Sequence, residues 1–221
     1  MPISRFIDKQ VAGARAKRER RKEARPGELL QAALDLFVEK GFAATRSEEV
    51  AARAGVSKGT LFLYFPSKEE LFKAVVRENI SGRFSQWNQQ FEDFEGSTAE
   101  MLHFCVQTWW ERVGNTQASG ISKLMFSEAS NFPELSAFYQ QEVVRPGHVL
   151  LTRIVQRGVD SGEFRPVDVG HAAYSLIAPM LFLMLSKHTA GMCTAPAFEL
   201  NPEVFLHQQV DLLIHGLVVP T

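Results

Sequence analysis

Apolar residues recur with a helical period along most of this chain. In the segment RPGELLQAALDLFVEKGF the apolar positions are Leu29, Leu30, Ala33, Leu34, Phe37 and Val38. This stripe predicts an amphipathic helix that buries one face. Pro26 suits the first turn of that helix, and Gly41 suits the left-handed position that ends it.

The next segment, TRSEEVAARAGVSKGTLFLYFP, predicts two short helices separated by a turn. Thr45 and Glu48 have the spacing of a capping box, and Gly55 ends the first helix. Ser57 is placed to cap the second helix, which Pro66 closes. Two helices joined by a short turn that contains glycine predict a helix-turn-helix.

Helical patterns continue to the end of the sequence. Ser67 and Glu70 repeat the capping-box spacing and open a fourth helix. Further helices are predicted near residues 84–94, 98–113, 119–129, 133–144, 146–160, 168–188 and 202–217, with Asp168 and Asn201 as caps. Strand patterns are lacking, so the predicted fold class is all-α. We expect a basic extension over 1–25, a three-helix domain over 26–72 and a larger helical domain over 73–221.

Charge is unevenly distributed along the chain. The 221 residues carry a formal net charge of −1, but residues 1–25 contain nine Lys or Arg against three acidic residues. A basic end attached to an acidic body favours a polyanionic partner at that end. A solvated tail without a partner is the alternative.

Composition excludes several other classes. With 45% hydrophobic and 22% charged residues, the chain is typical of a globular protein. The run LIAPMLFLML, residues 176–185, is too short to span a bilayer, so no membrane association is predicted. Cys105 and Cys193 lack the spacing of metal ligands. We therefore predict a cytoplasmic protein without a metal or a cofactor.

The motif GVSKG, residues 55–59, has two interpretations. It matches the G-x-S-x-G pattern of a serine hydrolase, in which the serine follows a buried strand. Here the preceding residues have a helical period, and no histidine occurs before His103. The second interpretation makes Ser57 the cap of a helix whose outer face carries Lys58 and Gly59. Since Gly59 lowers helix propensity by about 1 kcal/mol relative to alanine, close approach of another molecule is a reasonable compensation.

The segment from Leu30 to Ile80, above all GFAATRSEEVAARAGVSKGTLFLYFPSKEELF, resembles the DNA-binding domain of the TetR family of bacterial transcription regulators. The likeness covers about 50 residues without a gap. It departs from the family at Phe62, where a tyrosine is usual. The resemblance implies that the helix after Ser57 enters the major groove and the preceding helix crosses the DNA backbone.

The resemblance also implies a set of DNA contacts. Lys58 can reach a base edge, Gly59 permits close approach, and Tyr64 and Lys68 correspond to phosphate-binding positions. Burial of Phe62 is as consistent with the sequence as apolar contact with DNA. The full set expected at the DNA is Arg25, Arg46, Ser47, Ser57, Lys58, Gly59, Thr60, Phe62, Leu63, Tyr64 and Lys68. Arginines of the basic extension suit a narrow minor groove.

In the TetR family the larger domain binds a small effector and forms the dimer, so the same is expected here. Candidates for effector contacts are His103, Trp110, Phe126, Tyr139 and Tyr174. Candidates for a four-helix interface in a homodimer are Leu176, Met180, Leu183, Met184, Val210, Leu213, Ile214 and Leu217. Burial of the latter residues within one subunit is the alternative.

The sequence thus predicts a ligand-responsive transcription regulator that is not an enzyme. The expected mechanism is that of a repressor: a dimer binds a near-palindromic operator in double-stranded DNA and is released by a small, largely apolar effector. The alternatives are a DNA-binding protein without effector control and, more remotely, a serine hydrolase.

Overall fold

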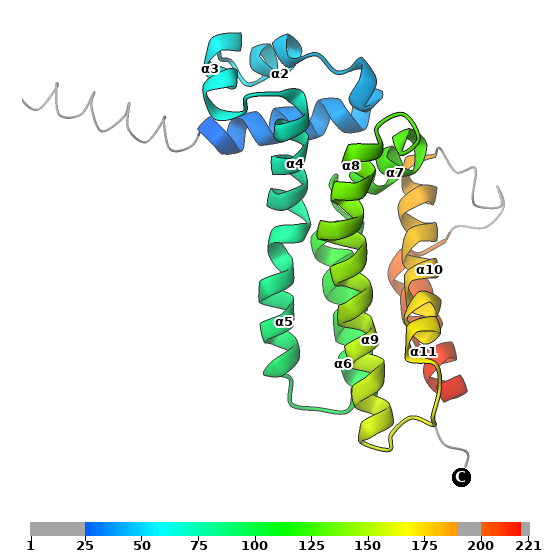
Figure 1. The fold of residues 1–221 in the computed structure, drawn as a ribbon. Coiled ribbons are helices and arrows are strands. Elements are labelled where there is room, and N and C mark those ends of the chain that lie inside the picture. Colours follow the sequence, from blue (N-terminus) through cyan, green and yellow to red (C-terminus); the bar gives the residue numbers. More distant parts are fainter. Residues whose placement is uncertain (1–24, 190–199, 218–221) are drawn as a thin grey trace, which may run out of the picture. The chain divides into compact units, whose positions relative to one another are not determined.

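The computed structural model describes residues 25–189 and 200–217. The chain divides into two compact units, Met1–Val75 and Val76–Thr221. The described residues form helices and connecting turns without a strand, which confirms the all-α fold class (Figure 1).

The first unit is a small helical domain. Residues 25–44 are helical and are followed by α2 (Ser47–Arg53), α3 (Lys58–Tyr64) and α4 (Lys68–Asn79). The last turn of α4 belongs to the second unit. The predicted three-helix arrangement with a helix-turn-helix is therefore present.

Three phenylalanines form the centre of this first domain. Phe37, Phe42 and Phe72 are fully buried, and their ring centroids lie 5.5–5.6 Å apart. Leu61, on the inner face of α3, is also completely buried. Leu61 is the one residue of α3 that is buried, so most of this helix faces away from the core of the domain.

The second unit is a bundle of longer helices (Figure 1). Its elements are η1 (Ser81–Arg83), α5 (Phe84–Glu92), α6 (Thr98–Trp109), η2 (Trp110–Gly114), α7 (Ser119–Glu128), α8 (Pro133–Tyr139), η3 (Gln140–Val144), α9 (Arg145–Asp160), α10 (Val169–His188) and α11 (Pro202–Leu217). Helix α9 packs against α5, α6 and α10, while α11 packs against α6 and α10.

One predicted break does not occur. The expected interruption before Pro146 is replaced by the π-helical turn η3, which joins α8 and α9 into one helical run. A π-turn changes the register of the backbone hydrogen bonds. This arrangement accommodates a proline, which has no amide hydrogen to donate.

Helix α10 is more apolar than its short central run suggested. By length and composition alone it is able to cross a membrane, with a mean hydropathy of 1.5 over an 18-residue window, a third of which is buried. In the structure α10 packs against α7, α9 and α11. A helix that packs inside a helical bundle can be as apolar as one that crosses a membrane, so composition alone does not distinguish the two.

The predicted dimer residues belong mainly to the core of one subunit. Leu176, Met180, Leu183, Met184, Val210 and Leu217 are buried within the chain, and Leu213 and Ile214 pack partly buried against the same core. For six of the eight residues the structure favours the alternative, burial within one subunit, while the interface itself stays a prediction. Apolar residues at helical spacing do not reveal whether a helix buries them inside its own subunit or against a second one.

Candidate DNA interface and effector cavity

The turn between α2 and α3 has the predicted capping geometry. Gly55 adopts a φ of 66°, in the left-handed region that glycine favours. The Ser57 hydroxyl oxygen accepts a hydrogen bond from the backbone amide of Thr60 at 3.1 Å. Ser57 is thus the N-cap of α3, and it follows a helix and a turn instead of the strand that a hydrolase elbow requires.

The cap of α2 differs from the prediction by one residue. Arg46 occupies the N-cap, and the Glu49 carboxylate accepts a hydrogen bond from its backbone amide at 3.2 Å. The Thr45 hydroxyl is buried and donates to the carbonyls of Gly41 and Leu36 instead. Glu48, its expected partner, forms an ion pair with Lys58.

Small and apolar side chains form much of the outer surface of α3. Leu63 is 85% exposed and Phe62 is 37% exposed, although both are large hydrophobic residues. Gly59 is exposed too, and a Cβ atom added there meets only the Ser57 hydroxyl oxygen, at 3.8 Å. No contact among the described residues therefore explains why this helix carries a glycine or an exposed leucine.

Charged groups beside this surface are held in intramolecular pairs. Lys58 Nζ lies 2.5 Å from a Glu48 oxygen and 5.6 Å from the centroid of the Phe62 ring. The hydrogen bond from Lys58 holds the pKa of Glu48 below its ordinary value. In the free protein the Lys58 ammonium group is therefore neutralised by a carboxylate.

Lys68 has a structural position that the sequence did not reveal. Its ammonium group donates to the backbone carbonyls of Phe42, Thr45 and Ala43 at 2.8, 3.1 and 3.4 Å. It also lies 4.4 Å from the centroid of the Phe42 ring. Lys68 thus joins the start of α4 to the segment before α2, which differs from its expected role as a phosphate contact.

The remaining predicted DNA residues differ in exposure. Arg46 is exposed, whereas Arg25, Ser47, Thr60 and Tyr64 are partly buried. The basic extension before Arg25 lies outside the described residues, so its expected DNA contact stays a prediction.

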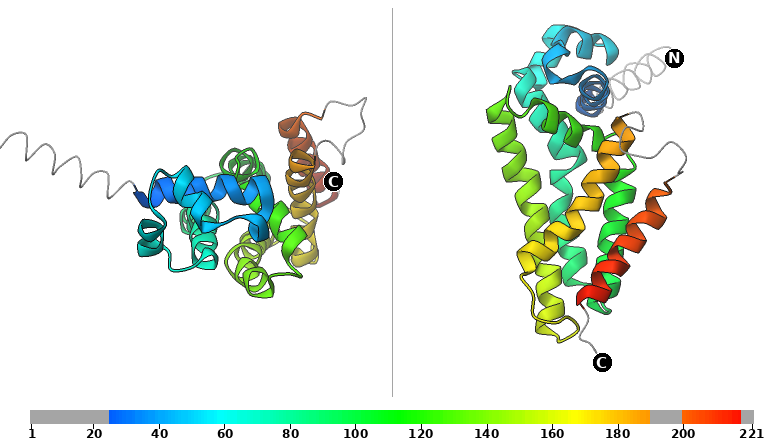
Figure 2. Two further views of the ribbon diagram at one scale, coloured as in Figure 1. Left: turned by 90° about the horizontal axis from the view of Figure 1, so that it is seen from above. Right: turned by 90° about the vertical axis from the view of Figure 1, so that its right-hand side faces the viewer.

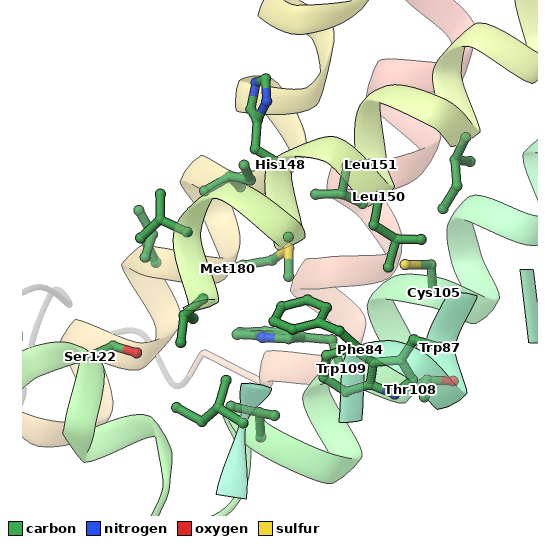
Figure 3. Close-up of a pocket in the computed structure, with 18 of the residues that line it drawn as sticks. Phe84, Trp87, Cys105, Thr108, Trp109, Ser122, His148, Leu150, Leu151 and Met180 are labelled. Atoms are coloured by element: carbon green, nitrogen blue, oxygen red, sulfur yellow. The ribbon is translucent and has the colours of Figure 1, made fainter. Parts of the chain in front are cut away.

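A cavity of about 400 Å³ lies inside the second unit (Figure 3). Helices α5 to α10 all contribute to its wall. Phe84, Trp87, Trp109 and Met180 are among the large apolar side chains that line it. The volume lies within the range of small-molecule sites in proteins.

Two polar atoms on the cavity wall have no hydrogen-bond partner. Trp87 Nε1 and Gln90 Oε1 are both buried and unpaired. Both residues line the cavity and lie one helical turn apart on α5. Since unpaired buried polar atoms are unfavourable, a donor and an acceptor here provide sites for a ligand.

Other polar groups on the wall are already paired. The hydroxyl oxygens of Tyr139 and Ser122 lie 2.7 Å apart, and burial raises the pKa of Tyr139 to about 12. His148 Nε2 lies 3.2 Å from the Gly170 carbonyl, which can only accept a hydrogen bond. Burial also raises the pKa of the Cys105 thiol to about 12, so this thiol stays protonated at neutral pH.

The structure brings together three of the five predicted effector residues. Tyr139, Phe126 and Tyr174 line the cavity, the last two as largely exposed residues. Trp110 is buried in the core, and His103 pairs with Asp211 on α11, so neither lines the cavity. An effector contact at any of the five residues stays a prediction.

Several wall residues were missed at the sequence level. Met180 and Met184, predicted at the dimer interface, line the cavity instead. The stripe of Phe84, Trp87 and Phe91 along α5 was detectable in the sequence. It indicated an apolar helix face, but a cavity beneath that face depends on how the neighbouring helices pack.

Comparison with known proteins identifies the family. Residues 29–75 match the model described as bacterial regulatory proteins, tetR family, and residues 94–192 match the tetracyclin repressor-like C-terminal domain. The two matches together cover most of the chain. The protein therefore belongs to the TetR family and is a transcription regulator with a helix-turn-helix DNA-binding domain.

Individual relatives agree with this assignment. The chain is 27% identical to the HTH-type transcriptional regulator RutR of Escherichia coli strain K12, over 91% of this chain and 94% of the relative. It is 29% identical to the HTH-type transcriptional repressor KstR2 of Mycolicibacterium smegmatis, over 65% and 69% of the respective chains.

Solved structures share the fold at lower sequence identity. FadR from Bacillus subtilis in complex with stearoyl-CoA has a TM-score of 0.66 at 17% identity, with 86% of this chain and 97% of that chain covered. A regulator from Saccharomonospora viridis in complex with choline has a TM-score of 0.70 at 20% identity, with 90% and 100% covered.

Proposed function

We propose that this protein is a dimeric repressor that leaves a near-palindromic operator when a neutral, largely apolar effector binds in the cavity. The proposal rests above all on the exposed outer face of α3, where no contact within the described part of the chain accounts for Gly59 or Leu63. The relative KstR2 is named a repressor. The apolar cavity of the second unit favours effector control over DNA binding without regulation.

Three exposed residues of α3, Lys58, Gly59 and Leu63, have a role at DNA under this proposal. Gly59 lets the backbone approach the groove, and Leu63 offers apolar contact of the kind that a thymine methyl accepts. Lys58 exchanges Glu48 for a base edge or a phosphate. Because an exposed ion pair contributes little to stability, this exchange is not costly. Arg46, Ser47 and Tyr64 are the proposed phosphate contacts.

Selection of DNA by the purified full-length chain tests this proposal. We expect the enriched sequences to contain a near-palindrome, and Lys58→Ala to relax the base preference at one position in each half-site. Lys123→Ala, in the second unit, is the control and leaves the preference unchanged. Binding to all duplexes alike contradicts operator recognition.

Deletion of residues 1–22 is expected to weaken binding and to reduce its salt dependence.

The cavity indicates the chemical class of the effector. None of the described residues on its wall is Asp, Glu, Lys or Arg. A charged ligand loses its hydration there without gaining a counter-ion, which is strongly unfavourable. A hydroxyl group, in contrast, can accept a hydrogen bond from Trp87 Nε1 and donate one to Gln90 Oε1.

A paired ligand screen tests this class. Alcohols and carboxylates with the same apolar skeleton are compared for their effect on the melting temperature and on operator binding. We expect alcohols to raise the melting temperature and to release DNA. Trp87→Phe keeps an aromatic ring but removes the indole N–H donor, so it should weaken both effects. Phe91→Leu, on the same helix, tests apolar contact alone. Consistently stronger effects of carboxylates contradict the proposed neutral effector.

A further inference from the structure

A cluster of two histidines and one aspartate lies outside the effector cavity. His103 belongs to α6, while His207 and Asp211 are four residues apart on α11. His103 and Asp211 are 108 positions apart in the sequence. The packing of α6 against α11 therefore creates this cluster, which no local sequence pattern indicates.

The atoms that bind metals point toward one another in this cluster. His103 Nε2 lies 3.0 Å from Asp211 Oδ1, and His207 Nε2 lies 3.4 Å from Asp211 Oδ2. One ligand atom from each of the three residues lies within 4.8 Å of the other two. A tetrahedral zinc ion with bonds of about 2.0–2.1 Å separates its ligand atoms by about 3.3 Å. Small side-chain rotations thus suffice to surround an ion.

The chemistry of the three side chains selects a class of ion. Two imidazole nitrogens and one carboxylate oxygen suit Zn²⁺ and neighbouring transition metals, whereas Mg²⁺ and Ca²⁺ prefer oxygen ligands. The negative charge of Asp211 offsets part of the charge of the ion. Three protein ligands leave at least one coordination position for water.

Solvent access to the cluster differs among its members. The side chain of His103 is 25% exposed, that of Asp211 43% and that of His207 66%. An ion can therefore enter from solvent without unfolding of the bundle. The imidazole rings of His103 and His207 lie 4.3 Å apart between centroids, so both nitrogens approach the carboxylate from neighbouring positions.

We propose that His103, His207 and Asp211 bind one transition-metal cation per chain, with Zn²⁺ as the representative ion. The bound ion joins α6 to α11 and replaces the contacts that the two histidines make with Asp211. This site is separate from the effector cavity and does not depend on the proposed effector or operator.

The test uses untagged full-length protein, freed of metal with a chelator and then titrated with Zn²⁺ against a chromogenic competitor. We expect one equivalent to bind with a dissociation constant that His207→Ala and Asp211→Asn each raise at least tenfold. Mg²⁺ should not bind. Co²⁺ should produce visible ligand-field bands that both variants lose, which separates coordination from a general change in stability.

His171→Ala is the matched control. His171 Nδ1 lies 3.0 Å from Asp168 Oδ2, so this pair has a similar spacing, and the described residues offer it no third ligand. Its loss should leave zinc affinity unchanged within about twofold. The absence of saturable Zn²⁺ binding, or equal affinity in the wild type, His207→Ala and Asp211→Asn, overturns the proposal. The high exposure of His207 makes misfolding of His207→Ala a poor explanation for lost binding.

Discussion

Gly59 lies in the first turn of α3, where glycine lowers helix propensity and no contact among the described residues requires it. A Cβ atom added there meets only the Ser57 hydroxyl oxygen, at an ordinary contact distance. A residue that destabilises the free protein, without a compensating contact inside it, is expected to contact another molecule. At Gly59 the proposed contact is with the floor of the DNA groove.

Gly59→Ala is therefore expected to stabilise the free protein while weakening operator binding. Its free energy of unfolding should rise by up to about 1 kcal/mol, because alanine favours the helix. Operator affinity should fall roughly tenfold, or about 1.4 kcal/mol. Urea unfolding and fluorescence anisotropy measure the two quantities. Gly216→Ala, at an open position of α11, should leave operator affinity unchanged. Undiminished affinity in Gly59→Ala rules out close approach at this residue.

Lys68 illustrates a different relation between a residue and its function. Its ammonium group contacts three backbone carbonyls that lie 23 to 26 positions earlier in the chain. Resemblance to the family suggested a phosphate contact, but in this structure Lys68 joins two segments of the DNA-binding domain. Its substitution is thus expected to act first on stability.

We expect Lys68→Met to lower the free energy of unfolding by about 1–3 kcal/mol, since it removes the donor from the partly buried carbonyl contacts at Phe42 and Thr45. Chemical denaturation of the full-length protein measures this change. Lys58→Met removes only an exposed ion pair and should have a much smaller effect. If Lys68→Met keeps full stability and loses DNA binding, the phosphate interpretation is correct after all.

At the scale of elements, the helical period predicted the helices well because it reports which face each helix buries. Helices α6, α7, α10 and α11 occur close to their expected positions. The joined run of α8, η3 and α9 did not follow from the sequence. Proline indicates a break unless the surrounding backbone changes its hydrogen-bond register, and that change depends on tertiary packing.

The contact between α9 and the loop after it depends on a single glycine. A Cβ atom at Gly158 comes within 2.2–2.8 Å of the ring of Phe164, which is almost completely buried. The Phe164 amide also donates a hydrogen bond to the Gly158 carbonyl at 2.9 Å. The ring therefore cannot move away without disturbing the end of α9.

Gly158→Ala is expected to destabilise the second unit by about 1–3 kcal/mol through this overlap, although alanine has the higher helix propensity. Thermal unfolding followed by circular dichroism measures the effect. Gly147→Ala, on the same helix, places its Cβ about an ordinary contact distance from Phe84 and should be close to neutral. Equal stability of the two variants contradicts a fixed position of Phe164.

For the whole molecule, the sequence revealed the class of protein more fully than it revealed the ligand sites. The helix-turn-helix around Ser57 consists of consecutive residues, so its motif could be recognised in the sequence. The cavity and the cluster of His103, His207 and Asp211 combine residues from separate helices. Their existence depends on interhelical packing, which a hydrophobic period does not specify.

The interface of the proposed dimer also depends on packing that the sequence pattern does not specify. The residues first assigned to its interface are mostly core, so we propose that a partner contacts other side chains of α10 and α11. The right-hand view of Figure 2 shows both helices running across one side of the second unit. Val204 and Leu212 of α11 are large apolar residues that remain 53% and 68% exposed. We propose that they lie in the interface.

A charge at these positions should therefore separate the subunits. Leu212→Glu and Val204→Glu are expected to shift a dimer to monomers, because an interface cannot bury an unpaired carboxylate without a large loss of free energy. Light scattering coupled to gel filtration measures the mass. Val149→Glu introduces the same charge at an exposed valine of α9 and should remain dimeric. Each monomer has a single α3, so its affinity for one half-site should equal that of the wild type. Its affinity for the full operator should fall, because two linked subunits no longer bind two half-sites together. A stable dimer in both α11 variants places the interface elsewhere.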